Sequence, residues 1–583
     1  MTSSEVERLP FSSRSVETWS RLDPRHINWP IVYVLDGPRR VYVGETRNTL
    51  ARMRQHLVDP HKAGLTSIRV VVDETFNKSA CLDLESHLIR WLAGDGQHEV
   101  LNRNDGITNA DYYERTRYRA DFAGIFERLK AQGVFTHTIP QIESSDLFKL
   151  SPFKALTPDQ ELAIEGIVEG LAEDLRGGEH SAITVQGEPG TGKTVVGIFL
   201  LKLLVDIGET VAIDEVELDS DSVFSEFFVE GTRELFTDLR LGLVIPQQSL
   251  RRSVKKVFKR TPGLDPDMVL SPFEVGQGGR FDVLIVDEAH RLNQRANQPA
   301  ANLNTSFRLI NERLFGADDP RYTQLDWINA QSTHQVLMVD PEQTVKPADL
   351  PAETIKELVE TAKSSHRHYP LMTQMRVAAG SDYVRYIRRL LDPDRASSGT
   401  PLEQPDFGDF DLRFFDDFAA MRLAIRARDS EHGLSRLIAG FAWKWVSRGK
   451  PHVNDIELDG VAMPWNRTQV DWISSPGSLD QVGSIHTVQG YDLNYAGVVM
   501  GPDLRYDPIA RRLFVDRASY FDAMGKQNNK KLGKVYTDDD LLRYIVNIYA
   551  VLLTRGMLGT YVYVCDPGLR EYLRSSFIRL DPT

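Results

Sequence analysis

One glycine-rich segment limits the possible folds of the 583-residue chain more than any other part. In ITVQGEPGTGKTVVGIFLLKLL, the pattern G-x-x-x-x-G-K-T runs from Gly187 to Thr194, with an apolar strand-like run before it and an apolar helix-like run after it. Glycines let such a loop curl until its N–H groups point at phosphate oxygens. The segment therefore predicts an α/β domain that binds the phosphates of a nucleotide.

The loop and one later acidic pair supply the expected nucleotide ligands. We expect Lys193 to reach the terminal phosphates and Thr194 to hold Mg²⁺. The run FDVLIVDEAHR ends an apolar strand in Asp287, which is expected to coordinate Mg²⁺, and Glu288, which is expected to polarise the attacking water. The predicted loop residues are Gly187, Glu188, Pro189, Gly190, Thr191, Gly192, Lys193 and Thr194.

From Leu156 onward, short apolar runs alternate with longer helical stretches. The runs are ITVQG, LGLVIP, FDVLIVDE, HQVLMVD, YAGVVMG and TYVYVCD. This alternation predicts parallel sheets covered by helices on both faces. The stretch is too long for one such sheet, so we expect two.

Six further segments occur in a characteristic order around the phosphate loop: LTPDQ before it, then VIPQQSLRRSVKKVFKR, VLMVDPEQ, LMTQMR, IHTVQGYDLNYAGVVMGPDL and YAVLLTRGMLGTYVY. Together with the phosphate loop they resemble a superfamily 1 helicase, and most of all the bacterial Schlafen-type DNA/RNA helicase-like domains. The resemblance spans about Phe148 to Asp566. It implies two RecA-like parallel-sheet lobes, bound ATP and Mg²⁺, and a DNA or RNA strand as partner.

The resemblance also implies roles for single residues. Gln160 would read the adenine, and Asp340 and Gln343 would sense the γ-phosphate. Two arginines would contact phosphate from the other side of the nucleotide, where cations stabilise the developing charge. The implied residues are Gln160, Asp340, Gln343, Arg376, Gln489, Gly490 and Arg555.

The segment RRSVKKVFKR, residues 251–260, holds six cations in ten positions. Val254, Val257 and Phe258 form an apolar stripe at helical spacing, so the cations are expected to face outward. Outward cations suit the phosphates of a strand, although a solvated helix face explains the same pattern.

The N-terminal part opens with two strand-like runs separated by Asp36-Gly37-Pro38, a hairpin turn. The continuation GETRNTLARMRQH predicts a helix capped by Asn48, with Arg52 and His56 on one face at i,i+4 spacing. In SACLDLESHLIRWLAG, Glu85 occupies the apolar stripe of a second helix. A buried carboxylate is costly unless it is paired or binds metal, so this position indicates function.

These features resemble a GIY-YIG nuclease domain, with Ile31-Val32-Tyr33 and Tyr42-Val43-Gly44 as the two triplets. The first triplet departs from the family pattern because Ile31 replaces glycine. The resemblance implies that Tyr33 or Tyr42 helps to activate water, that Arg52 holds the scissile phosphate and that Glu85 binds one Mg²⁺ or Mn²⁺. The implied site residues are Tyr33, Tyr42, Arg52, His56, Glu85 and Asn102. The structural alternative is a pair of core tyrosines beside a Glu–Arg pair.

The expected organisation is an extension over 1–27, a small α+β GIY-YIG domain over 28–132, a linker over 133–155, and lobes over 156–362 and 363–583. Two cysteines, Cys81 and Cys565, exclude a disulfide framework and a four-cysteine zinc site. Neither a signal peptide nor a membrane span is evident, so we expect a cytoplasmic protein. The net charge of −13 argues against unspecific coating of nucleic acid but allows a local basic channel.

The resulting hypothesis is an ATP-dependent nucleic-acid translocase or helicase coupled to a metal-dependent endonuclease, suited to bacterial antiviral defence or repair. Two alternatives stay open. In one, the N-terminal domain only binds nucleic acid while the motor runs. In the other, the chain is a nucleotide-gated switch without strand transport. The sequence leaves open whether the strand is DNA or RNA, and which oligomer forms.

Overall fold

The computed structural model describes residues 4–102, 111–178, 180–209, 224–296, 301–341, 343, 347–374, 377, 379–398, 402–450, 452–467, 472–473, 475, 477–488, 493–522, 525–529, 532–574 and 576–577. The chain forms two compact units. The first holds residues 1–179, 194–243 and 251–269, and the second holds 180–193, 244–250 and 270–583. Among the helices of the described residues, none is long and apolar enough to cross a membrane.

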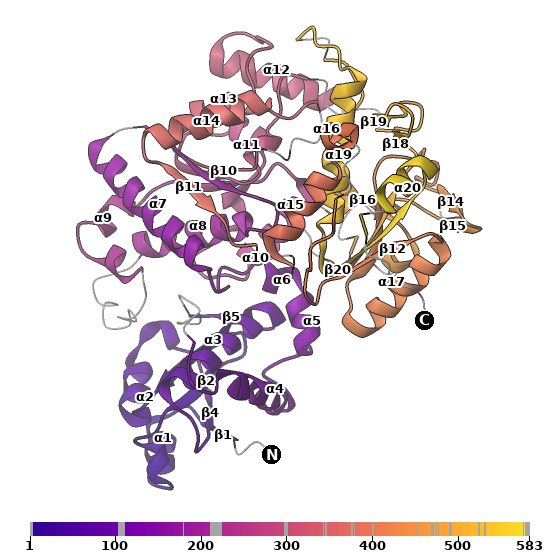
Figure 1. The fold of residues 1–583 in the computed structure, drawn as a ribbon. Coiled ribbons are helices and arrows are strands. Elements are labelled where there is room, and N and C mark those ends of the chain that lie inside the picture. Colours follow the sequence, from indigo (N-terminus) through magenta and orange to yellow (C-terminus); the bar gives the residue numbers. More distant parts are fainter. Residues whose placement is uncertain are drawn as a thin grey trace. The chain divides into compact units, whose positions relative to one another are not determined.

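The N-terminal part of the first unit is a five-stranded sheet in the order β1-β4-β2-β3-β5 (Figure 1). The predicted hairpin is confirmed, because β2 pairs antiparallel with β3 and places Tyr33 opposite Gly44. The sheet also recruits β1, from the segment expected to be an extension, which pairs antiparallel with β4. The strands are β1 (Glu5–Pro10), β2 (Ile31–Asp36), β3 (Arg40–Thr46), β4 (Ser67–Val72) and β5 (Glu99–Val100).

Helices that lie between and after its strands in the sequence accompany this sheet. The predicted cap is confirmed, because the Asn48 side chain accepts a hydrogen bond of 3.1 Å from the backbone N–H of Ala51 at the start of α2. Leu84 and Leu88 of α3 pack in one apolar cluster with Val32 of β2. The helices of this part are α1 (Ser13–Ser20), α2 (Thr49–Val58), α3 (Lys78–Asp95) and α4 (Arg115–Ala131).

The expected linker is partly helical and packs on the N-terminal fold. It contains α5 (Ile139–Ser144) and α6 (Asp146–Lys149). Ile142 and Phe153 are buried in the same apolar cluster as α3. Short helices of this kind lack the sustained periodicity that sequence analysis relies on, so the sequence predicts a linker here.

The remaining helices of the first unit include α7 (Pro158–Gly177) and α9 (Arg233–Phe236), while α8 (Lys193–Glu209) and α10 (Gln248–Phe258) begin at residues of the second unit. The predicted stripe of α10 is confirmed, because Val254, Val257 and Phe258 are buried. The exposed cations of this segment are Arg252, Lys256, Lys259 and Arg260. The Ser253 hydroxyl donates a 2.6 Å hydrogen bond to Asp146 of α6.

The first of two further sheets has the order β11-β6-β10-β9-β7-β8. Strand β10 lies parallel to both β6 and β9, and β11 lies parallel to β6. The strands are β6 (Ser181–Gly187), β7 (Leu241–Val244), β8 (Val269–Leu270), β9 (Phe281–Val286), β10 (Ser332–Val339) and β11 (His368–Leu371). Helices of this lobe within the second unit are α11 (Pro272–Gln277), α12 (Ala301–Phe315), α13 (Gln324–Gln331) and α14 (Ala352–Ser364).

The second parallel sheet has the order β12-β20-β17-β13-β16, and its neighbouring strands all run parallel. Its strands are β12 (Asp411–Phe415), β13 (Ser435–Ala439), β16 (Gly483–Ser484), β17 (Leu493–Met500) and β20 (Gly556–Val564). Two small antiparallel pairs accompany it, β14 (Ile456–Leu458) with β15 (Val461–Met463) and β18 (Leu504–Asp507) with β19 (Arg512–Val515). The expectation of two parallel sheets is thus confirmed, and this mixed α/β arrangement fits RecA-like helicase lobes.

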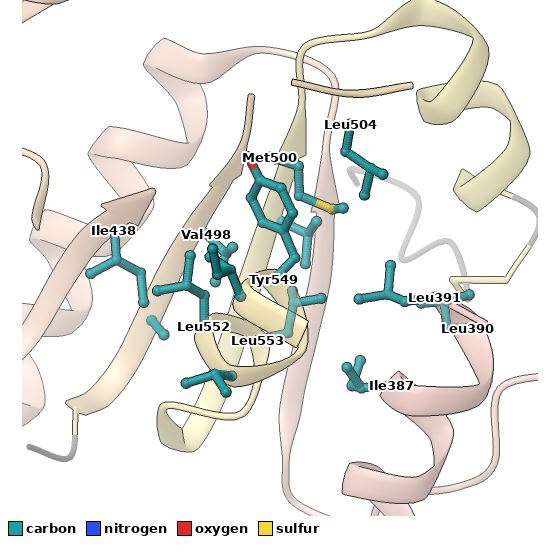
Figure 2. Packing of buried hydrophobic residues seen from close by; sticks show 14 of the residues in the cluster. Ile387, Leu390, Leu391, Ile438, Val498, Met500, Leu504, Tyr549, Leu552 and Leu553 are labelled. Atoms are coloured by element: carbon teal, nitrogen blue, oxygen red, sulfur yellow. The ribbon is translucent and has the colours of Figure 1, made fainter. Parts of the chain in front are cut away.

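Helices cover both faces of the second parallel sheet, as its continuous apolar strands predict. Val498 packs in one cluster with Leu552 of α19, whereas the next residue, Val499, packs in another with Met421 of α17. Figure 2 shows the first cluster, in which Tyr549 and Leu553 of α19 lie beside Met500 and Val498. The helices are α15 (Gly380–Leu390), α16 (Pro393–Ser398), α17 (Phe418–His432), α18 (Ile485–Val488), α19 (Asp538–Leu553) and α20 (Pro567–Arg574).

One polar pair is embedded in this apolar core. The Tyr549 hydroxyl donates a 2.5 Å hydrogen bond to Asp503 and accepts one of 2.8 Å from the backbone N–H of Gly501. Burial raises the pKa of Asp503 to about 7, although the hydrogen bond from Tyr549 opposes this rise. The pair ties the loop after β17 to α19.

The Asp503→Asn substitution should remove a pH-dependent loss of stability. Because the folded-state pKa is raised, the carboxyl group favours folding below its ordinary value of 3.8, and this contribution is lost as the pH rises through about 7. An amide oxygen still accepts the Tyr549 hydrogen bond but does not ionise. We therefore expect urea denaturation midpoints of the variant to fall less than those of the wild type between pH 4 and 8; an unchanged slope would contradict the assignment.

Candidate functional site

The phosphate loop follows β6 in the conformation that its glycines allow. Gly190 and Gly192 have φ angles of 92° and 81°, a region that side chains disfavour. A Cβ at Gly187 would lie 2.3 Å from the Thr191 hydroxyl oxygen. The buried Lys193 ammonium donates hydrogen bonds of 2.6 and 3.0 Å to the carbonyls of Gly187 and Glu188. Thr194 follows in the first turn of α8.

The acidic pair directly follows β9, as predicted. Asp287 is fully buried, and Glu288 has a left-handed backbone with φ 49°. The Arg291 Nε donates a 2.8 Å hydrogen bond to Glu288 Oε2, and His290 Nε2 lies 3.0 Å from the same oxygen. Arg291 and His290 therefore hold the Glu288 carboxylate from two sides.

The charge of Glu288 is stabilised by its neighbours. Burial by itself raises the pKa of this carboxyl, but His290, Arg291 and Lys193 together hold the pKa well below its usual range. Glu288 is therefore ionised at neutral pH.

The third predicted motif is connected to this carboxylate. The backbone N–H of Asp340 donates a 3.2 Å hydrogen bond to His290 Nδ1, which puts the proton of a neutral ring on Nε2, facing Glu288. Gln343 Nε2 donates a 2.8 Å bond to Asp340, and Arg291 reaches Gln343 Oε1 at 3.4 Å. Sequence analysis gave His290 no firm role and missed Arg291. The signal that could have identified them is their position in the turn that directly follows Asp287 and Glu288.

Later segments of the chain also reach the loop, one of them directly after β11 of the same sheet. The Gln374 amide donates a 2.6 Å hydrogen bond to the Pro189 carbonyl, a contact that sequence analysis did not predict. Pro189, Gln343 and Thr554 line a small cavity of about 10 Å³, and Thr554 precedes the buried Arg555. Arg388 and Asn547 line this cavity and also a larger one of about 620 Å³.

Three predicted residues lie outside the described part of the chain: Arg376, Gln489 and Gly490. Gln160 belongs to the first unit, where it is buried and accepts a 3.0 Å hydrogen bond from the backbone N–H of Thr157 at the start of α7. Its role in reading adenine stays a prediction.

In the N-terminal part, the two tyrosines and the histidine come together. The fully buried Tyr33 lies with its hydroxyl 2.7 Å from His56 Nε2. The ring centroids are 6.4 Å apart for the two tyrosines, and that of His56 is 5.0 Å from Tyr42. A Cβ at Gly44 would lie 2.3 Å from the Tyr33 hydroxyl, so only glycine fits opposite this ring.

Charges from two helices act on this cluster. Burial raises the pKa of Tyr33 well above 10, Tyr42 and Glu85 add to the rise, and Arg52 opposes it. Burial, then Lys62 and Arg52, lower the pKa of His56 to about 2. At neutral pH the imidazole is therefore uncharged and the Tyr33 phenol keeps its proton, so the Tyr33–His56 hydrogen bond joins two neutral groups.

Asn102 has a structural position in this part. Its amide donates a 2.8 Å bond to the Val43 carbonyl and accepts a 3.0 Å bond from the Val43 N–H. It thereby continues the pairing of β5 with β3 and fixes the strand that carries Tyr42. Glu85 is half-buried on α3.

Only one group of three or more potential metal ligands meets the spacing for a shared ion among the described residues: Glu165, Glu169 and Glu226. Two of the three are exposed, as acidic surface groups commonly are. The predicted metal ligands Glu85, Thr194 and Asp287 are oxygen donors, which suits Mg²⁺ or Mn²⁺.

Comparison with known proteins identifies the C-terminal part. Residues 180–566 match the Schlafen group 3, DNA/RNA helicase domain family, which is more than half of the chain. The chain therefore belongs to this family and carries a helicase-like P-loop domain, as the motif order predicted.

Two relatives and one solved structure resemble the chain. The uncharacterized protein YPL245W of Saccharomyces cerevisiae is 26% identical over 460 residues, 74% of this chain and 93% of the yeast protein. The ATP-dependent DNA helicase RecG of Streptococcus pneumoniae is 22% identical over 249 residues, 39% of this chain and 35% of that protein. The Pif1 helicase from Bacteroides, in complex with ADP-AlF3 and ssDNA, aligns with 70% of this chain and 92% of that chain at 10% identity and a TM-score of 0.25.

Replacing Asn102 with alanine should loosen β3. The change leaves the buried Val43 N–H and carbonyl without these partners, which costs about 1–3 kcal/mol. We expect faster hydrogen exchange at the Val43 amide, measured by mass spectrometry on the whole chain. The exposed Asn28 provides the control, and Asn28→Ala should leave exchange in β3 unchanged. Equal exchange in both variants would contradict the role of Asn102.

Proposed function

We propose that the chain is an ATP-driven nucleic-acid motor joined to a metal-dependent endonuclease. The observation that supports the motor most directly is the network of contacts that connects Glu288, His290, Asp340 and Gln343. It joins the carboxylate after β9 to the third helicase motif, and Lys193 of the phosphate loop helps to keep the pKa of that carboxyl low. Membership of the Schlafen group 3 helicase family supports the same function.

In the motor, Glu288 is the base that orients and polarises water for attack on the γ-phosphate. Its two partners hold the carboxylate in place, so it needs no rearrangement when the nucleotide binds. Asp287 and Thr194 would hold Mg²⁺, which neutralises phosphate charge. Gln343 would sense the γ-phosphate, and its bonds to Asp340 and Arg291 would pass a change there to Glu288. In this proposal, residues later in the chain would complete the site: Arg376, Arg555, and Gln489 and Gly490 of the fifth motif.

The nuclease proposal rests on the Tyr33–His56 hydrogen bond beside Tyr42. Tyr33 is fully buried and hydrogen-bonded to His56, so it serves as a support for the site. Tyr42 is half-buried, and we assign to it the contact with the attacking water. Arg52 would hold the scissile phosphate, and Glu85 would bind the Mg²⁺ or Mn²⁺ that stabilises charge on that phosphate. Attack of water on phosphorus then breaks one ester P–O bond and leaves a hydroxyl end and a phosphate end.

The alternative of an N-terminal domain that only binds nucleic acid rested on Ile31. This side chain is buried in a regular strand position opposite Thr46, where the backbone does not require glycine. Its presence therefore does not disturb the tyrosine pair, which favours a catalytic N-terminal domain over one that only binds nucleic acid. A nucleotide-gated switch remains the second alternative, and it predicts ATP hydrolysis that is indifferent to added strands. A part in defence against foreign nucleic acid, or in repair, is proposed from the architecture alone.

Glu288→Gln should abolish ATP hydrolysis while nucleotide binding persists. The amide keeps the shape of the side chain but loses the charge, so we expect a loss of at least about 100-fold in turnover. Lys193→Ala should lower both turnover and nucleotide affinity. Turnover is measured by phosphate release with and without DNA or RNA, and the exposed Glu357→Gln on α14 is the control. Normal turnover in Glu288→Gln would disprove the assigned role.

Glu85→Gln should abolish Mg²⁺-dependent cleavage of nucleic acid and leave binding intact. Labelled single- and double-stranded DNA and RNA, each with and without ATP, would reveal the substrate. Glu74→Gln, at an exposed position of the same domain, is the matched control. Persistent cutting by Glu85→Gln would exclude the metal role. Binding without cutting by the wild type would instead support the binding-only domain.

A further inference from the structure

Lys62 is a buried cation beside the tyrosine pair that no motif in the sequence singled out. It ends the short 3-10 helix η2 (Pro60–Lys62), which follows α2. Its side chain is 3% exposed, and its ammonium lies 3.0 Å from Asp59 Oδ2. The same ammonium lies 4.2 Å from the centroid of the Tyr42 ring.

A buried ammonium is costly, so its location needs an explanation. Asp59 compensates part of this cost and is itself held in place, because it accepts a 2.8 Å hydrogen bond from the backbone N–H of His61. The aromatic face of Tyr42 attracts the cation by its quadrupole. An apolar side chain of similar length would fill the space without the desolvation cost, which indicates that the charge has a use.

The positive charge of Lys62 acts on both Tyr42 and His56. Through its place on the ring face, the Lys62 ammonium limits how the Tyr42 ring tilts next to His56, whose centroid is 5.0 Å away. It also lowers the pKa of His56, together with burial and Arg52. An uncharged imidazole keeps a nitrogen lone pair that can accept a hydrogen bond.

We propose that Lys62 is a positioning residue for phosphodiester cleavage, which fixes the Tyr42 ring against His56. This inference rests on the proposed nuclease function. It adds to the residues implied by the GIY-YIG resemblance a lysine held by Asp59, beyond the helix that carries Arg52 and His56.

The test compares Lys62→Met, which keeps length and loses charge, with Lys62→Arg, which keeps charge. Displacing a catalytic ring by a fraction of an ångström to an ångström costs about 10- to 100-fold in rate. We therefore expect Lys62→Met to lose about 10- to 100-fold in kcat with KM changed less than twofold, and Lys62→Arg to recover part of that loss. The control is Lys78→Met, at an exposed position in the same domain.

Thermal unfolding separates positioning from a structural role. Lys62→Met alone leaves the half-buried Asp59 carboxylate without its cation, so the melting temperature of this variant should fall, whereas the double variant with Asp59→Asn removes both charges and should recover it. Loss of cleavage in the double variant with melting like that of the wild type supports the inference. Wild-type kcat in either variant overturns it, as does a loss in Lys62→Met that disappears when the double variant restores the melting temperature.

The two proposals fail differently. If the wild type cuts none of the DNA or RNA substrates, the nuclease proposal falls and the role of Lys62 falls with it. If the wild type cuts and Lys62→Met cuts equally well, only the role of Lys62 is wrong.

Discussion

The arrangement around Glu288 depends on one constraint: a carboxylate withdrawn from water must be compensated by nearby cations and hydrogen-bond donors. His290 and Arg291 meet this requirement from the turn that follows β9. Because the same two side chains also contact Asp340 and Gln343, compensation of one charge connects the end of β9 to the end of β10. The parallel pairing of these strands places both ends at one edge of the sheet.

The same principle, in a different form, organises the N-terminal cluster. There the buried polar groups are a phenol, an imidazole and an ammonium, gathered around a glycine that leaves room for a ring. Burial keeps the phenol protonated and the imidazole neutral, so the Tyr33–His56 hydrogen bond joins two neutral groups. Strand pairing by Asn102 keeps the neighbouring strand at the register that this packing needs.

Much of the fold follows from local signals in the sequence. The phosphate loop, the strand ending in Asp287 and Glu288, the hairpin and the Asn48 cap each rest on a few adjacent residues, because glycine conformations, strand burial and capping are local requirements. The stripe of α10 is predictable for the same reason. By contrast, β1 and the helices α5 and α6 are short, and they owe their structure to packing against α3 and β4.

The sequence by itself determined the residue types, the strand–loop–helix context and the order of motifs, from which the helicase family follows. Only the tertiary structure decided which partners those residues meet. Gln374 against Pro189, His290 between Glu288 and Asp340, and Lys62 over Tyr42 each join elements that no spacing rule connects. The physical reason is that such contacts depend on strand order and on how side chains fill a shared interior, which are properties of the packed chain and not of any short segment.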